Sequence, residues 1–230
     1  MPVVATNTAA NSALRFLNNN SSMASSSVSK LASGSRIVKA SDDAAGLAIG
    51  TRLKADVTAL TQAGINASQG ASVVQVADGG LGRIGDVLQR MKALAAQSLS
   101  GVPTDTERGF IDAEFQQLVD EVRDIAITTR FNGASLLDGA TAAQNAQDYF
   151  VGTDVSDTIT VAFTALAAAV NGFTATALGF VAAVGVQDAT GAASAMTLID
   201  TAIDTVSEAR ATAGALISRF EFRGQQIATS

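Results

Sequence analysis

The sequence predicts a mainly α protein, an elongated antiparallel bundle or coiled coil of long helices with a small central insert that contains β-hairpins. Three observations lead to this prediction. Apolar residues recur at alternating spacings of three and four, the heptad pattern of helices that pack along a seam. Proline occurs only at Pro2 and Pro103, so the longest heptad stretch is uninterrupted. Short β-type segments gather near the centre, at Tyr149–Val151 and Thr158–Phe163.

The composition narrows the function before any motif is considered. The 230 residues include no cysteine, histidine or tryptophan, which argues against thiolate zinc sites, haem ligation and Ser-His-Asp catalysis. A net charge of −6 argues against nucleic acid as the main partner. Hydrophobic residues make up 47% of the chain but aromatic ones only 5%, which suits helix-to-helix packing better than a ligand-binding core. We therefore expect no enzyme, no metal and no cofactor.

The first predicted helix ends at Gly34, a favourable residue for a helix C-terminus. Its apolar seam reads Leu14, Leu17, Ser21, Ala24, Val28 and Leu31.

A second helix is predicted to begin at Ser41, whose hydroxyl can cap it, with Asp42 and Asp43 at the positive end of the helix dipole. Over residues 43–99 it would be about 85 Å long. Its seam contains one step of three instead of four, which is a stammer, and reads Leu53, Val57, Leu60, Gly64, Ala67, Ala71, Val74, Ala77, Leu81, Ile84, Leu88, Met91 and Ala95.

Thr104 and Glu107 form the capping box of a third helix, which is predicted to end before the turn at Phe131-Asn132-Gly133. Its seam reads Ile111, Phe115, Leu118, Val122 and Ile125. A last helix is predicted from about Ala192, with the seam Met196, Ile199, Ile203, Val206, Arg210, Ala213, Ile217, Phe220, Gly224 and Ile227. Asn171-Gly172 predicts a hairpin turn within the insert.

Three patterns suggest other functions, and each has a simpler interpretation. Gly80, Gly82 and Gly85 match the dinucleotide fingerprint, but the helical seam runs straight through them and no strand–turn–helix unit is predicted. The uncharged window between Asp157 and Asp188 is long enough for a membrane span, but no Lys or Arg flanks it. Acidic pairs lack a third ligand or a base; they are Asp42/Asp43, Glu107/Asp112 and Asp154/Asp157.

Four segments, in order, resemble bacterial flagellin. They are Lys30–Ile49 (KLASGSRIVKASDDAAGLAI), Leu88–Gln97 (LQRMKALAAQ), Thr129–Gly139 (TRFNGASLLDG) and Ile199–Phe220 (IDTAIDTVSEARATAGALISRF). The resemblance covers roughly residues 1–152 and 190–230.

The resemblance implies a structural subunit of the flagellar filament that self-assembles through coiled-coil helices for motility. Implied partners are other flagellin subunits, the flagellar export apparatus and the cap, with no membrane insertion and no nucleic acid. The subunit would be extracellular, exported by the type III route without a cleavable signal peptide.

The resemblance also divides the chain. Residues 1–40 would be the filament-core helix, with Leu14, Leu17, Val28 and Leu31 on its seam. Residues 41–140 and 190–230 would form a helical rod, and 141–189 a short variable insert with β-hairpins. The rod-packing seam would comprise Leu53, Val57, Leu60, Leu88, Met91, Ile111, Phe115, Leu118, Val122, Ile203, Val206, Ile217 and Phe220.

Flagellins continue beyond the match at Phe220 with a terminal helix that pairs with the filament-core helix. Nothing follows Ser230 here, so the helix within 1–40 is expected to be unpaired. A helix of this size is marginal alone in water. We therefore expect residues 1–35 to be disordered or held by another molecule, and this chain not to form normal filaments by itself.

Flagellins are also sensed by a Toll-like receptor of the host. The matching positions are Gln89, Arg90, Leu94 and Gln97, with Glu114 on the neighbouring helix. Arg90 and Leu94 are four apart, lie off the Leu88–Met91–Ala95 seam and are expected to be exposed, with Arg90 as the anchor. The simpler interpretation is a solvated face with no partner.

Two alternative functions remain open at this point. One is a flagellin-like cell-surface protein that binds an extracellular polymer or ion through residues 140–190; the other is a hook-associated junction protein. Arg210, on the seam of the last helix, also has two interpretations. Its stem covers apolar surface, or it forms an ion pair with an acid from residues 105–124.

Overall fold

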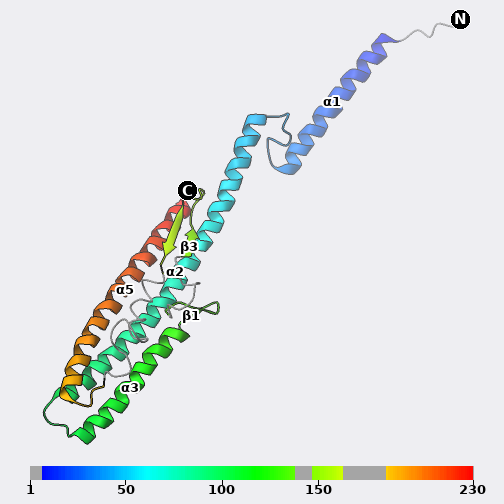
Figure 1. Ribbon diagram of the computed structural model, residues 1–230. Helices are drawn as coiled ribbons and strands as arrows, with labels where there is room; N and C mark the ends of the chain where they lie inside the picture. Colours follow the sequence, from blue (N-terminus) through cyan, green and yellow to red (C-terminus); the bar gives the residue numbers. More distant parts are fainter. Residues whose placement is uncertain (1–6, 138–146, 163–184, 230) are drawn as a thin grey trace. The chain divides into compact units, whose positions relative to one another are not determined.

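A computed structural model of the chain describes residues 7–137, 147–162 and 185–229. The fold is mainly α, as predicted (Figure 1). Its elements are α1 (Thr8–Ser33), α2 (Ala44–Leu99), α3 (Asp105–Thr128), β1 (Arg130–Phe131), β2 (Ala134–Ser135), β3 (Gln147–Phe150), β4 (Thr158–Val161) and α5 (Ala189–Thr229). The chain divides into two units, Met1–Thr58 and Ala59–Ser230, and α2 begins in the first and ends in the second.

In the first unit, α1 is capped at both ends. The Asn7 side chain accepts a hydrogen bond of 3.1 Å from the backbone N–H of Ala10. At the other end Gly34 has a φ of 65°, a left-handed conformation that glycine adopts without strain, and its N–H donates to the carbonyl of Leu31. The predicted stop at Gly34 is confirmed.

The helix α2 begins later than predicted, and Ser41 is not its cap. The carboxylate of Asp43 accepts a 2.8 Å hydrogen bond from the N–H of Gly46, and α2 begins at Ala44. Asp42 turns back instead, accepting from the backbone N–H groups of Val38 and Lys39 at 3.3 and 3.2 Å. The backbone hydrogen bond from Lys39, followed by that from Val38, lowers the pKa of Asp42 below its ordinary value.

In the second unit, α3 and α5 run along α2 (Figure 1). One hydrophobic core fills the space between them, and its largest fully buried side chains are Phe115, Phe220, Leu81, Ile84, Leu88, Met91, Leu137 and Ile199. Val122 and Val206 are also buried, whereas Leu118, Ile203 and Ile217 are half-buried at the edge of this core. Within this unit, the predicted rod-packing seam therefore faces the core.

The buried face of α5 differs from the predicted seam by a small rotation. It consists of Ala192, Ala195, Ile199, Ala202, Val206, Ala209, Ala213, Leu216 and Phe220. Arg210, which the heptad spacing placed on the seam, is exposed instead. Small alanines at every third or fourth position allow α5 to approach its neighbours closely, which an arginine on that face would prevent.

The predicted start of α3 is confirmed. The backbone N–H of Thr104 donates to the Glu107 carboxylate at 2.7 Å, and the N–H of Glu107 donates back to the Thr104 hydroxyl at 3.4 Å. The bond from the Thr104 N–H, followed by a 2.8 Å bond that the Thr104 hydroxyl donates to the same carboxylate, lowers the pKa of Glu107.

After α3, the predicted turn joins β1 to β2. Asn132 and Gly133 have φ values of 49° and 82°, which is the pattern of a type I′ hairpin turn. The turn is confirmed, and the two short strands beside it were not predicted.

The three glycines of the dinucleotide pattern lie inside α2, so the helical interpretation is confirmed. At Gly80 the chain after α3 packs closely against α2. A Cβ there would lie 2.6 Å from the hydroxyl of Thr129 and 2.9 Å from Leu137 Cδ1. The glycine therefore serves close packing and not phosphate binding.

The predicted strands of the insert are confirmed as β3 and β4, an antiparallel pair in which Tyr149 lies opposite Ile159. The hairpin turn predicted at Asn171-Gly172 lies outside the described residues. Across the described ranges, no helix is long and apolar enough to cross a membrane.

Candidate assembly and recognition surfaces

The first candidate surface is the apolar face of α1. No residue of α1 is buried. The four predicted filament-core residues are between 58% and 84% exposed, and they are Leu14, Leu17, Val28 and Leu31. Phe16 and Met23, which the sequence analysis did not single out, add to the exposed apolar area. A helix with this much exposed apolar surface is typical of helices that pack against a partner.

The rod-packing seam is covered along only part of α2. In the first unit Leu53 is 58% and Val57 61% exposed. In the second unit Leu60 is half-buried, and continuous burial begins at Ala63. Close by, a Cβ on Gly64 would touch Ile227 of α5 at 3.7 Å.

Ion pairs between helices flank the core of the second unit. Arg90 Nη2 lies 2.6 Å from Glu114 Oε1 of α3. On α5, Asp200 pairs with Lys92 and Arg210 Nε lies 3.0 Å from Asp78 Oδ1. Each pair is at least partly exposed, so each contributes at most about 1 kcal/mol. The acid that pairs with Arg210 comes from α2, so the prediction of a partner from residues 105–124 was wrong.

Of the predicted receptor-recognition residues, Arg90 of α2 and Glu114 of α3 are in contact, and all but Leu94 are exposed or half-exposed. Gln89, Arg90 and Gln97 are exposed, and Arg90 reaches Glu114 through both Nε and Nη2, at 2.9 and 2.6 Å. Leu94 is only 2% exposed, so its expected exposure was wrong.

Leu94 is buried because α2 packs against two helices and not one. The buried face of α2 includes Leu94 as well as Met91 and Ala95. A heptad seam with two apolar positions per repeat predicts burial against a single neighbour only, so it does not include Leu94.

A buried polar cluster joins α2, α3 and the segment before α5. Asp112 is 6% exposed, and its two carboxylate oxygens accept 2.8 Å bonds from the N–H of Val186 and the side-chain amide of Gln187. The hydroxyl of Ser98 donates to the carbonyl of Val186. We call Ser98, Asp112 and Val186 the clasp. Sequence reasoning missed it, since its signal is only an acid beside the seam residue Ile111.

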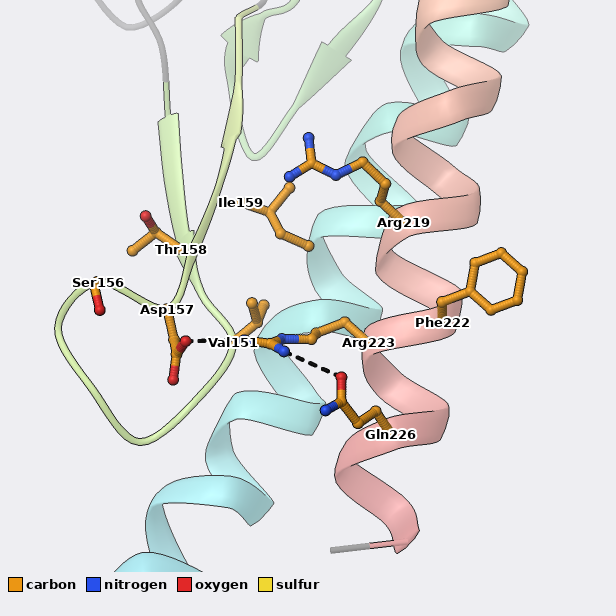
Figure 2. Close-up of a pocket in the computed structure, with 9 residues that line it drawn as sticks. All are labelled: Val151, Ser156, Asp157, Thr158, Ile159, Arg219, Phe222, Arg223 and Gln226. Atoms are coloured by element: carbon orange, nitrogen blue, oxygen red, sulfur yellow. Dashed lines mark hydrogen bonds and ion pairs between the residues drawn. The ribbon is translucent and has the colours of Figure 1, made fainter.

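A pocket of about 330 Å³ lies between the loop joining β3 to β4 and the last turns of α5 (Figure 2). Asp157 Oδ1 accepts a 3.0 Å bond from Arg223 Nη2, and its Oδ2 accepts from the N–H groups of Thr153 and Asp154. Asp157 thus fixes the loop and links it to α5. The pair Asp154/Asp157 is therefore part of a loop structure.

No group of three or more histidine, cysteine, aspartate or glutamate residues that could hold a metal ion occurs in the described part of the chain. Each acidic pair noted in the sequence includes an acid with a structural contact. Asp43 and Glu107 cap helices, Asp112 belongs to the clasp, and Asp157 fixes a loop.

Comparisons with known proteins agree on one family. The sequence profile of the bacterial flagellin N-terminal helical region matches residues 4–142. A flagellin of Clostridium tyrobutyricum is 47% identical over 134 residues, which is 58% of this chain and 36% of that protein. The flagellar filament 30.7 kDa core protein of Treponema maltophilum is 33% identical over 217 residues, 93% of this chain and 76% of that protein.

Among solved structures, Bacillus cereus flagellin is similar with a TM-score of 0.60 at 29% identity, over 71% of this chain and 88% of that one. The chain spans about a third of the length of the Clostridium relative and about three quarters of the Treponema relative. Because the family profile covers more than half of the chain and the relatives agree in sequence and in fold, this protein belongs to the bacterial flagellin family, the structural proteins of the extracellular flagellar filament.

Proposed function

We propose that this flagellin joins the filament through the exposed apolar face of α1. Leu14, Leu17, Val28 and Leu31 repeat along one side of a helix that is capped at both ends and buries none of its own residues. Covering each of these side chains yields about 1.5–3 kcal/mol, so the face gains most of its stabilisation from a partner. This exposed stripe is the observation that carries the proposal.

The proposal assigns a different task to each part of the chain. Residues 1–40 form the filament-core helix, and 41–140 with 190–230 form a rod that packs against neighbouring subunits. Residues 141–189 are a variable insert. In support, the part of the rod seam in the second unit is buried in a core, while Leu53 in the first unit is exposed.

We further propose that the subunit leaves the cell through the flagellar export apparatus, without a cleavable signal peptide, and is placed under the filament cap. The absence of cysteine is compatible with a chain that is threaded unfolded and folds outside. Family membership favours this role over a surface protein that binds an external polymer or ion.

A Toll-like receptor of the host is the second proposed partner, at the surface formed by Gln89, Arg90, Gln97 and Glu114. These side chains project from two packed helices and are exposed or half-exposed. Leu94 supports the surface from below because it is buried.

Seeded assembly tests the filament role. Fluorescently labelled chain is added to growing filaments of an intact flagellin, and its incorporation is measured by sedimentation and microscopy. We expect Leu17→Asp with Val28→Asp to abolish incorporation, and Asn19→Asp with Ser26→Asp, which add the same charge to exposed polar positions of α1, to preserve it. Equal incorporation of both variants would contradict the proposal, as would a wild-type chain that never incorporates.

A further inference from the structure

We propose that the pocket beside Arg219 and Arg223 binds the acidic face of α3, formed by Glu121 and Asp124, of a neighbouring copy of this chain. This inference rests on the proposed filament function. The contact would be one of the charged interfaces between subunits of the filament. It joins two different faces of the same molecule.

The loop that forms one wall of the pocket is held in place by its own hydrogen bonds. Asp157 Oδ2 accepts bonds of 3.3 Å from the N–H groups of Thr153 and Asp154, and the carbonyl of Asp157 accepts from the N–H of Val151 at 2.8 Å. Gly152 is required here, since a side chain on it would collide with the Asp157 carboxylate. The Asp157 carboxylate thus already binds its own loop and Arg223.

Two arginines, Arg219 and Arg223, line the pocket together with this single acid. Arg223 is held by Asp157 at 3.0 Å and by the side-chain oxygen of Gln226 at 3.1 Å. Arg219 extends from α5 toward the strand that carries Ile159 (Figure 2). Within the described ranges Arg219 forms no ion pair. The pocket therefore carries one positive charge in excess, and an arginine fork suits a carboxylate.

The complementary charge lies on another helix. Glu121 and Asp124 are exposed residues of α3, three positions apart and hence on one side of the helix. Neither carboxylate forms an ion pair among the residues that the structure describes. By contrast, Asp120 beside them is already paired with Arg123 at 2.9 Å.

The position of these acids favours α3 over the exposed acids of α5 as the source. Asp204 and Glu208 lie on α5 itself, so their contact with the pocket of a second copy would be made by the same helix on both sides. When such a contact is reciprocal, with the acids of each copy on the pocket of the other, it closes a dimer. A contact between α5 of one copy and α3 of the next is heterologous and can repeat without closing, as a filament requires.

The contact also implies a stagger between neighbours. Arg210 lies opposite Asp78, and Glu114 lies opposite Arg90. Both α5 and α3 run antiparallel to α2. Arg219 is nine residues beyond Arg210 and therefore lies level with residue 69 of α2. Glu121 is seven residues beyond Glu114 and lies level with residue 83. Fourteen residues of helix correspond to a shift of about 20 Å along the axis between adjacent copies.

The absence of natural cysteine allows a cross-linking test on the full chain. Phe222→Cys places a thiol at the pocket edge and leaves both arginines intact. Gln117→Cys places one on the face of α3 that carries Glu121 and Asp124. Equimolar, isotope-distinguished copies are mixed at low salt with a short bis-maleimide, and the mixed dimer is quantified by mass spectrometry. Ala211→Cys replaces Phe222→Cys in the matched control, because it is exposed on α5 away from the pocket.

We expect the mixed dimer to exceed the Ala211→Cys control. Arg219→Glu in the Phe222→Cys copy should lower its yield about fivefold, in line with the modest strength of exposed ion pairs. Combining Arg219→Glu with Glu121→Arg and Asp124→Arg in the partner copy should restore the yield. A yield equal to the control, or one that ignores these charge changes, overturns the contact. Seeded incorporation of the wild-type chain tests the filament function separately, so the two failures can be told apart.

Discussion

The ring of Phe220 in α5 occupies the space where a side chain on Gly70 of α2 would begin. A Cβ on Gly70 would lie 2.6 Å from both Cε1 and Cζ of Phe220. Tyr149 of β3 meets the same ring edge-on, with centroids 5.5 Å apart and an interplanar angle of 88°. Two helices and the β3–β4 hairpin therefore converge on one aromatic side chain, and the hairpin is held in place by it.

The first prediction concerns this contact. Gly70→Ala should destabilise the second unit by about 1–3 kcal/mol, because the added methyl group collides with a fully buried ring. Gly79→Ala is the matched control. It lies in the same helix with nothing within 4 Å, so it should stabilise by about 0.5–1 kcal/mol through helix propensity. Urea unfolding followed by circular dichroism measures both, and equal effects would count against the contact.

The second prediction concerns the clasp. Asp112→Ala removes the acceptor for the N–H of Val186 and for Gln187, and leaves a buried backbone donor unsatisfied. We expect a loss of about 1–3 kcal/mol and faster amide hydrogen exchange at Val186. Asp120→Ala, an exposed position on α3, should change stability by less than about 0.5 kcal/mol. Unchanged exchange at Val186 would show that the clasp does not hold this segment.

The third prediction concerns receptor recognition. Arg90→Ala should lower receptor signalling about thirtyfold or more if Arg90 is an energetic hot spot of that interface. Its effect on folding should stay within about 1 kcal/mol, since its pair with Glu114 is exposed. Arg83→Ala, exposed on the same helix, is the control. A reporter-cell dose response separates the two variants, and full signalling by Arg90→Ala would refute the proposed anchor.

The fourth prediction concerns pH. Since the pKa of Asp42 is lowered on folding, its contribution to the connector between α1 and α2 is fully present above the ordinary value of 3.8. It should be lost as the pH falls below 3.8 and through the lower folded pKa. A carbon-detected NMR titration of the Asp42 carboxyl measures this pKa directly. Asp42→Asn should remove the acid-dependent shifts of the Val38 and Lys39 amides, and their persistence would assign the titration to another group.

Sequence patterns predicted much of this fold because many of its determinants are local. The capping box at Thr104 and Glu107 and the left-handed stop at Gly34 depend on a few neighbouring residues, and both are confirmed. Heptad spacing likewise located the long helices, because burial along one side imposes a period on the sequence.

The corrections arise where the outcome depends on a neighbour that spacing cannot identify. Ser41 and Asp43 are both good capping residues, and the choice is made by the connector, in which Asp42 binds the preceding backbone. Leu94 is buried because α2 has two neighbours in the second unit. Arg210 pairs with Asp78, a contact between residues far apart in the sequence.

The two caps of α1 set the length of the surface that the helix offers. Between Asn7 and Gly34 the helix has 26 residues, or about 39 Å. The stripe from Leu14 to Leu31 lies inside these limits, so neither end of the apolar surface depends on a fraying turn. A partner that covers the stripe must present a matching number of helical turns. Asn7 and Gly34 would therefore fix the length of the contact without touching the partner themselves.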